Sequence, residues 1–141
     1  MIQKTASVYL HVPFCAGACD YCDFYSVASF ASDARLDRTV DRLIEDTASL
    51  LDSYSISEVP SIFIGGGTPS FLGAERMGRL LRELGALLPN KVRELSLEAN
   101  PESVDEKFLE TCPSSGATRI SLVYKVLMIG PAGPWGGLEK A

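Results

Sequence analysis

Three cysteines stand close together near the start of the chain, at Cys15, Cys19 and Cys22. Three thiolates in one short loop can hold three corners of a cubane iron–sulfur cluster and leave the fourth iron open to another ligand. Clusters held entirely by cysteine use four of them at other spacings, and structural zinc sites use two separated pairs. The C-x3-C-x2-C spacing therefore predicts a cluster with one open coordination position.

Two other interpretations of these cysteines stay open. His11, the only histidine of the chain, could complete a Cys3His zinc site with them. The cysteines could also be incidental to a plain α/β domain. The fourth cysteine, Cys112, lies far along the chain and before Pro113, where a buried structural thiol is favoured over a ligand.

The composition is that of one soluble globular domain. The chain has 141 residues, of which 46% are hydrophobic and 22% charged, with a formal net charge of −5. Acidic and basic residues are interspersed, which argues against binding to nucleic acid or to anionic membranes. No segment is long and apolar enough to span a membrane, and the amino terminus lacks the apolar core of a signal peptide. We therefore expect a cytoplasmic protein whose clustered thiols bind metal and form no disulfides.

The elements that must position these thiols alternate between strands and helices. Residues 7–12 alternate in polarity and predict a strand that ends directly before the cysteine loop. A helix is predicted over 33–53, and a short apolar strand at 61–64 is closed by the glycines 65–67. A second helix is predicted over 73–88. The apolar positions behind these predictions are Val8, Leu10 and Val12, then Leu36, Val40, Leu43, Ile44, Leu50 and Leu51, and then Met77, Leu80, Leu81, Leu84 and Leu88.

The second half of the chain continues this alternation. A third strand is predicted over 94–98 and a fourth over 118–122. Between them, Ser103 and Glu106 have the spacing of a capping box that opens a short helix. The residues of this helix expected to point inward are Val104, Phe108 and Leu109.

Alternating strands and helices of this size build a parallel sheet, either open or rolled into a barrel. In such sheets, the chemistry lies at the carboxyl ends of the strands. The cysteine loop, the glycines 65–67 and Glu98 all fall at such ends. We therefore expect these three features to meet at one edge of an α/β domain.

Four segments together resemble the radical S-adenosylmethionine (SAM) family, and in particular the branch of oxygen-independent coproporphyrinogen III oxidases and their heme-chaperone relatives. They are the cysteine segment from Tyr9 to Phe24, Phe63-Ile-Gly-Gly-Gly-Thr-Pro-Ser70, Glu98-Ala-Asn-Pro-Glu102 and Gly116-Ala-Thr-Arg-Ile-Ser-Leu122. Their order and spacing match the family over residues 8–122. The resemblance implies the N-terminal part of a partial (β/α) radical SAM barrel, truncated after about four strands.

The resemblance also implies the cofactors and their contacts. It implies that the three clustered cysteines hold a [4Fe–4S] cluster, whose open iron chelates the amino and carboxylate groups of SAM. An electron donor such as a flavodoxin or ferredoxin then supplies the electron that releases a 5′-deoxyadenosyl radical. The SAM contacts carried over are Gly66, Gly67, Thr68 and Glu98, with Tyr9 and Tyr21 beside the cluster and the cofactor.

Tyr9, Tyr21 and His11 also have structural interpretations that involve no cofactor. Tyr9 and Tyr21 are also compatible with ordinary aromatic residues of a core or a rim. His11 matches a histidine of the family pattern, but a strand histidine that hydrogen-bonds to backbone is at least as compatible as a catalytic one. We therefore assign no catalytic residue from the sequence.

Phe24 distinguishes between the two branches of the family. The oxidases carry a further cysteine two residues after the last cluster ligand, and Phe24 occupies that position here. The resemblance therefore favours a heme chaperone, which binds and delivers heme, over an oxidoreductase that decarboxylates coproporphyrinogen III to protoporphyrinogen IX. The predicted partner is accordingly heme, with coproporphyrinogen III as the alternative.

The end of the chain departs from the family pattern, so we divide it into a radical SAM segment at 1–122 and a tail at 123–141. The tail is rich in glycine and proline and shows no periodicity. When its codons are regrouped from the third base of the Leu122 codon, they can encode Gly-Val-Gln-Ser-Phe-Asp-Asp-Arg-Ala, the segment that the family has there. We therefore predict a single-base deletion near codon 122 and an out-of-frame tail. We also expect the chain alone to fold poorly, to bind a cluster weakly and to be inactive.

Overall fold

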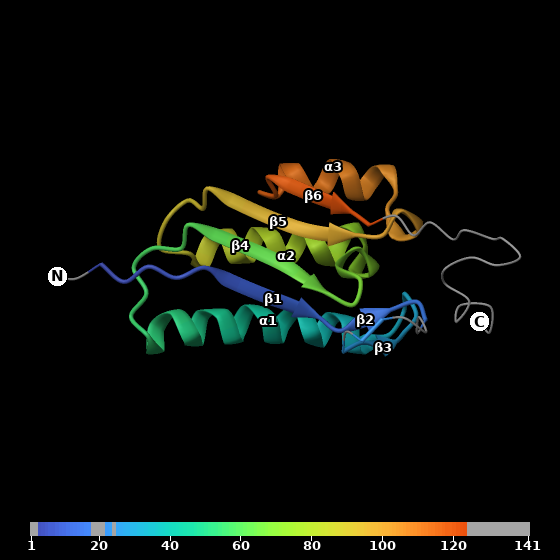
Figure 1. Cartoon of the computed structure of the whole chain (residues 1–141), viewed down its shortest axis with the longest axis horizontal. Helices are drawn as coiled ribbons and strands as arrows, with labels where there is room; N and C mark the ends of the chain where they lie inside the picture. Colours follow the sequence, from blue (N-terminus) through green and yellow to red (C-terminus); the bar gives the residue numbers. More distant parts are fainter. Residues whose placement is uncertain (1–2, 18–21, 24, 124–141) are drawn as a thin grey trace, which may run out of the picture.

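Four parallel strands form the central sheet of the computed structural model, which describes residues 3–17, 22–23 and 25–123. Their order across the sheet is β1 (Val8–Val12), β4 (Ser61–Gly66), β5 (Glu94–Ala99) and β6 (Arg119–Leu122). The arrowheads of all four strands point toward the same end of the molecule (Figure 1). The predicted parallel sheet is therefore confirmed.

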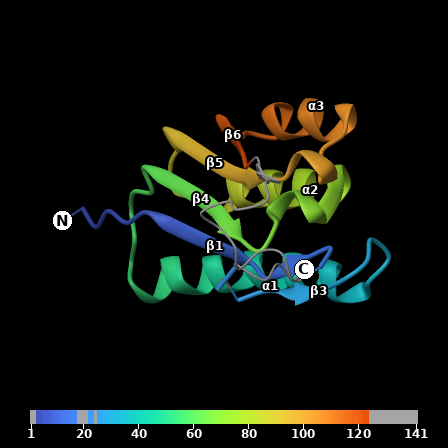
Figure 2. The ribbon, with the colours of Figure 1, turned by 45° about the vertical axis from the view of Figure 1, so that its right-hand side comes forward.

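Three helices cover one face of this sheet (Figure 1 and Figure 2). α2 (Gly73–Leu87) lies between α1 (Ala34–Ser53) and α3 (Glu106–Ser114) and packs against both. The short 3-10 turns η1 (Pro69–Leu72) and η2 (Pro101–Ser103) follow β4 and β5. Within the described residues, the opposite face of the sheet carries no helix. We call it the helix-free face.

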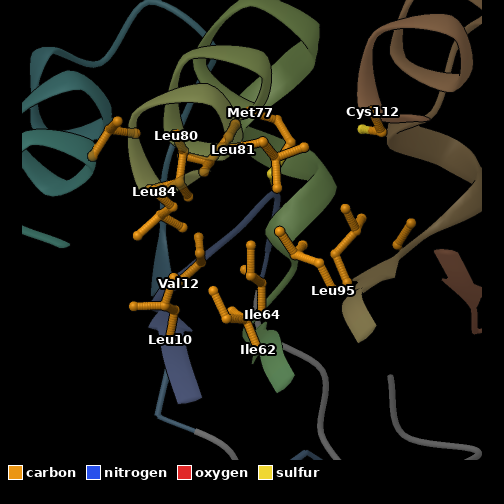
Figure 3. Close-up of a cluster of buried hydrophobic side chains, with 14 of the residues drawn as sticks. Leu10, Val12, Ile62, Ile64, Met77, Leu80, Leu81, Leu84, Leu95 and Cys112 are labelled. Carbon is orange, nitrogen blue, oxygen red and sulfur yellow. The ribbon is translucent and has the colours of Figure 1, made fainter. Parts of the chain in front are cut away.

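The hydrophobic core lies between the sheet and the helices. Figure 3 shows strand residues directed at α2, namely Leu10, Val12, Ile62 and Ile64 facing Met77, Leu80, Leu81 and Leu84. Successive side chains of a strand point to opposite faces of a sheet. The residues between these core positions, such as Tyr9, His11 and Phe63, therefore lie on the helix-free face.

The strand register extends this alternation across the sheet. Tyr9 is paired with Phe63, and Phe63 is paired with Ser96. Gly65 and Glu98 follow two residues after Phe63 and Ser96, so they share their face. The helix-free face thus collects polar, aromatic and glycine positions of three neighbouring strands.

The start of α3 differs from the sequence prediction. The N-cap is Asp105, whose carboxylate accepts a hydrogen bond from the Phe108 N–H at 2.7 Å. Ser103, predicted as the first residue of a capping box, lies in η2 and hydrogen-bonds to Ser70 instead. Aspartate is as good an N-cap as serine, and its charge also interacts favourably with the helix dipole.

Two leucines of the predicted apolar faces lie at the surface. Leu50 is 56% exposed and Leu109 is 47% exposed. Leu109 follows the buried Phe108, and one step along a helix rotates a side chain by about 100°, which carries Leu109 out of the core. The other boundaries agree closely with the prediction, with β4 running on through Gly66 and α2 ending at Leu87.

Candidate cofactor site

The cysteine segment leaves the sheet at the end of β1. Its first residues form β2 (Phe14–Cys15), which pairs in parallel with β3 (Val27–Ala28). The Ser29 N–H also donates to the Cys15 carbonyl at 3.0 Å. This strand pair, which the sequence analysis misses, closes the segment into a loop and anchors its first cysteine.

The structure describes two of the three predicted cluster ligands. Cys15 is half-buried, Cys22 is exposed, and both thiols are free. Cys19 lies outside the described residues. Across the described ranges, no three metal-binding side chains come together. The three-thiolate ligand set therefore stays a prediction.

The glycine turn after β4 is bound directly to the start of the cysteine loop. The Gly67 N–H donates to the Val12 carbonyl at 2.8 Å. The Thr68 N–H donates to the Phe14 carbonyl, also at 2.8 Å. The Thr68 hydroxyl lies 3.3 Å from the Cys15 sulfur. The cysteine loop and the glycine turn thus meet at the carboxyl ends of β1 and β4, as the sequence predicts.

This contact explains why two of the glycines lack a side chain. Gly66 has a φ of +119°, and a Cβ there would lie 2.6 Å from the Val12 carbonyl oxygen. A Cβ on Gly67 would lie 2.7 Å from the Phe14 carbonyl oxygen and 2.9 Å from the Cys15 sulfur. The close approach of the protein's own backbone therefore requires both glycines. The SAM contact that the resemblance implies for them stays a prediction.

Gly65, which has no separate role in the sequence predictions, allows three side chains to approach its backbone on the helix-free face. A Cβ there would lie 2.9 Å from the Phe63 ring and 3.2 Å from the Glu98 carboxylate. The Tyr9 ring would also lie 3.2 Å away. Tyr9 and Phe63 stack with ring centroids 6.1 Å apart. A glycine directly after an apolar strand was the available signal, since it often marks such a close approach.

Tyr9 and Glu98 influence each other beside Gly65. Tyr9 is 57% exposed, and the partial desolvation of its phenol raises its pKa, which the negative charge of Glu98 raises further. The phenol is therefore neutral at physiological pH, beside a carboxylate that can only accept hydrogen bonds. Tyr21, the second predicted aromatic contact, lies outside the described residues.

His11 uses both ring nitrogens within the protein. Its Nε2 lies 3.0 Å from the Tyr25 carbonyl, which can only accept, so this nitrogen carries the proton. Nδ1 then accepts a hydrogen bond from the Tyr9 hydroxyl at 3.1 Å. The interpretation of His11 as a backbone-bonded strand residue is confirmed. These bonds also argue against the Cys3His zinc site, because neither nitrogen of His11 is left to bind a metal.

A buried hydroxyl joins the glycine turn to the end of β5. Ser70 is completely buried, and its Oγ accepts a hydrogen bond from the Asn100 N–H at 2.9 Å. The same oxygen lies 2.5 Å from the Ser103 hydroxyl, which donates to the Asn100 carbonyl at 3.0 Å. Ser70 therefore holds the turn that carries Thr68 against the residues that follow Glu98.

Cys112 takes no part in the site. It is completely buried on α3, and desolvation raises the pKa of its thiol to about 11. Metal ligation requires the thiolate, so a thiol that stays protonated is a poor ligand. The prediction of a buried structural thiol is confirmed.

The donor set at the strand ends fits an iron–sulfur cluster. Thiolates are soft ligands that suit such clusters, and Cys15 and Cys22 both carry free thiols. The Cys15 sulfur faces a hydroxyl and a glycine, and a Cβ on that glycine would lie within 2.9 Å of the sulfur. The glycine therefore allows the turn to approach this thiol closely.

The fold is that of the radical SAM proteins. The chain matches the radical SAM superfamily over residues 9–123 and belongs to it. The matched range contains the cysteine loop, the glycine turn and Glu98. The predicted cofactors, a [4Fe–4S] cluster and SAM, are thus confirmed at the level of the superfamily.

Curated relatives connect the chain to heme and porphyrin proteins. It is 37% identical over 123 residues to heme chaperone HemW of Lactococcus lactis subsp. lactis, covering 86% of this chain and 31% of that protein. It is 38% identical over 117 residues to heme chaperone HemW of Escherichia coli K12, covering 82% and 31%. It is 36% identical over 130 residues to anaerobilin synthase of Escherichia coli O157:H7, covering 86% and 29%. The chain thus spans about a third of the length of these relatives.

A solved structure shows the same fold. Coproporphyrinogen III oxidase from Escherichia coli, a radical SAM enzyme, superposes with a TM-score of 0.72 at 24% sequence identity. The match covers 85% of this chain and 27% of that one. The predicted fold class, the N-terminal part of a radical SAM barrel, is therefore confirmed. In the described part of the chain, no helix has the length and apolar character needed to cross a membrane.

Proposed function

We propose that this chain is the cofactor-binding part of a radical SAM protein that handles heme. The cluster ligands in this proposal are Cys15, Cys19 and Cys22, and the SAM contacts are Tyr9, Tyr21, Gly66, Gly67, Thr68 and Glu98. The observation that carries it is the 3.3 Å approach of the Thr68 hydroxyl to the Cys15 sulfur. This contact brings the free thiol of Cys15 against the glycine turn that follows β4. Glu98 lies on the neighbouring strand, β5.

The cluster, when bound, supplies the electron that cleaves SAM. The residues of the chain bind and orient the cofactor. The Glu98 carboxylate can accept hydrogen bonds from amino or hydroxyl groups. The Tyr9 hydroxyl donates its hydrogen bond to His11, and its oxygen can still accept a hydrogen bond from the cofactor. Ser70 keeps Thr68 and Glu98 in a constant relation, because its buried hydroxyl binds the backbone of the turn after β5.

We propose heme binding and delivery as the role of the whole protein. The similarity to two heme chaperones supports this role, as does Phe24 at the position where the oxidases have a further cysteine. Decarboxylation of coproporphyrinogen III is the second candidate, because the structural neighbour is a coproporphyrinogen III oxidase. In both cases a one-electron donor such as a flavodoxin or ferredoxin reduces the cluster. The protein acts in the cytoplasm and binds no nucleic acid.

Anaerobic reconstitution of the 141-residue chain with iron and sulfide tests the cluster site. We expect partial occupancy in visible and paramagnetic resonance spectra, a spectral change on adding SAM, and loss of the cluster in Cys15→Ala, Cys19→Ala and Cys22→Ala. A Cys112→Ser control should retain it, because that thiol is buried on α3. Unchanged iron content in Cys19→Ala, or zinc in place of iron and sulfide, would contradict the site.

Heme titration separates the two candidate roles. The protein to use is the longer product of a gene whose frame is restored after Leu122. A chaperone should bind heme with a stable Soret absorption and leave coproporphyrinogen III unchanged. Decarboxylation of coproporphyrinogen III without stable heme binding would replace the first role by the second.

A further inference from the structure

Two aspartates of α1 and three of its arginines lie on different flanks of the helix, and Asp46 lies beside the last of these arginines. On one flank, aspartates pair with arginines of α2 at 2.9 and 2.6 Å, and the pairs are Asp37–Arg76 and Asp41–Arg79. The other flank carries Arg35, Arg38 and Arg42, spaced by three and four residues so that they are neighbours on the helix surface. We call this second flank the arginine face.

The arginine face borders a hollow of about 570 Å³ between α1 and the β2–β3 pair. Apolar parts of the lining come from Phe14, Val27 and Leu43. The charged lining consists of the three arginines, and no carboxylate takes part among the described residues. A surface with apolar contacts beside concentrated positive charge complements an acidic protein partner.

Two of the three guanidinium groups are available to a partner. Arg35 is held by Asp33 at 2.6 Å and lies over the Phe14 ring, 5.9 Å from its centroid. Arg42 forms an exposed pair with Asp46, and such pairs contribute little and exchange readily. Arg38 forms no ion pair with any residue that the structure describes.

The hollow lies on the outer side of the cysteine loop. Phe14 and Cys15 are successive residues of β2, so their side chains point in opposite directions. The Phe14 side chain lines the hollow, whereas the Cys15 sulfur faces Thr68. A partner seated on the arginine face therefore approaches Cys15 from the side opposite to the glycine turn.

We propose that the arginine face docks an acidic electron-transfer protein that carries a flavin or an iron–sulfur cofactor. The inference rests on the proposed function, because only a chain with a redox cluster needs such a donor. One electron leaves the donor cofactor and enters the cluster, and no bond forms or breaks. The net charge of −5 repels an acidic partner, and the three arginines of this surface can steer it to the loop.

Binding of an acidic flavodoxin to the chain without its cluster tests the docking directly. The double variant Arg38→Glu/Arg42→Glu should raise the Kd at least about tenfold at low salt, and added salt should weaken wild-type binding. The control variant Lys91→Glu/Arg93→Glu makes the same change in charge on exposed residues at the amino end of β5. It should leave the Kd within about twofold, because it lies at the opposite end of the strands.

Reduction kinetics of the reconstituted chain separate docking from the integrity of the cluster. Reduced flavodoxin should reduce the cluster of the arginine variant at least about tenfold more slowly than that of the wild type. Dithionite needs no docking surface, so its rate should be the same in both. The control variant should match the wild type with both reductants.

Several results would overturn the inference. The first is a control variant that binds flavodoxin as weakly as the arginine variant does. The second is an arginine variant that binds flavodoxin as tightly as the wild type. The third is an arginine variant whose cluster is reduced more slowly by dithionite to the same degree as by flavodoxin. Absence of binding to the longer, frame-restored protein would also overturn it, because a downstream segment would then cover the arginine face. Failure of the longer, frame-restored protein to hold a cluster, with flavodoxin binding that still depends on Arg38 and Arg42, would reject the proposed function and support the docking surface.

Discussion

The three successive glycines after Ile64 lack side chains for three different reasons. Gly66 adopts a positive φ directly against β1. Gly67 lies against the Cys15 sulfur, and Gly65 allows Tyr9, Phe63 and Glu98 to approach its backbone. The positive φ of Gly66 is a property of the turn's own backbone conformation. The reasons at Gly65 and Gly67 depend on residues that other segments of the chain place beside them.

Gly67→Ala should lower both stability and cluster occupancy. The added methyl group would lie 2.7 Å from the Phe14 carbonyl oxygen, so the turn or the loop must shift. We expect a loss of about 1–3 kcal/mol in the free energy of unfolding, typical of overpacking. Denaturant unfolding and iron content measure the two effects.

The control for this substitution is Gly85→Ala, on the exposed side of α2. A Cβ there has no neighbour within 4 Å, and alanine is the better helix former by about 0.5–1 kcal/mol. It should therefore stabilise the protein. If Gly67→Ala were as stable as the wild type and retained the cluster equally well, the tight contact between turn and loop would be refuted.

At the scale of elements, the start of α1 secures the end of the cysteine loop. Asp33 is the N-cap and accepts a hydrogen bond from the Arg35 N–H at 2.9 Å. The Ser29 hydroxyl, directly after β3, donates to the same carboxylate at 2.7 Å. The cap therefore connects α1, which carries the arginine face, to the strand pair that anchors Cys15.

This cap predicts an acid-sensitive contribution to stability. Hydrogen bonds from the Arg35 side chain, from Ser29 and from the Arg35 N–H hold the pKa of Asp33 well below its usual value of 3.8. A lowered pKa in the folded state stabilises the protein fully above the unfolded value, and this contribution is lost as the pH falls below it.

Asp33→Ala should therefore lower the Tm at neutral pH, and the difference from the wild type should shrink below a pH of 3.8. Thermal unfolding monitored by circular dichroism across this range is the measurement. Asp52→Ala, on an exposed residue in the last turn of α1, is the control and should not lower the Tm. A difference that persists unchanged in acid would show that the Asp33 charge has no role.

At the scale of the whole molecule, the sheet has two strands that pair on one side only. Within the described residues, β1 and β6 are the outer strands. Leu122 and Val123, at the end of β6, are 43% and 50% exposed. Outer strands with exposed apolar residues pair readily with other chains. The predicted out-of-frame tail starts at this point, and the structure of residues 124–141 lies outside the described part.

Insertion of one base near codon 122 should therefore improve the behaviour of the protein. We expect the longer product to have a higher Tm and less light scattering than the 141-residue chain, because further strands can pair with β6. Its cluster occupancy should also rise. Resequencing of the gene shows whether the deletion is genomic. A related in-frame gene that encodes the same tail would disprove the frameshift.

Much of the fold follows from local patterns in the sequence. The alternation of Val8, Leu10 and Val12 and the helical spacing of Met77, Leu80 and Leu84 each depend on neighbours within one segment. The start of α3 was harder to predict, because Ser103 and Asp105 are both good N-caps and the contact of Ser103 with Ser70 decides between them. Leu109 was misplaced because a short helix offers too few turns to define its inner face.

The sequence by itself determined the class of the protein, since the spacing of Cys15, Cys19 and Cys22 and the order of the strands are properties of the chain. Only the tertiary structure placed Thr68 at 3.3 Å from Cys15 and Gly65 between Tyr9 and Glu98. It also revealed the β2–β3 pair and the arginine face beside it. These features depend on register and packing between segments that are far apart in the chain, and periodicity within one segment carries no information about them.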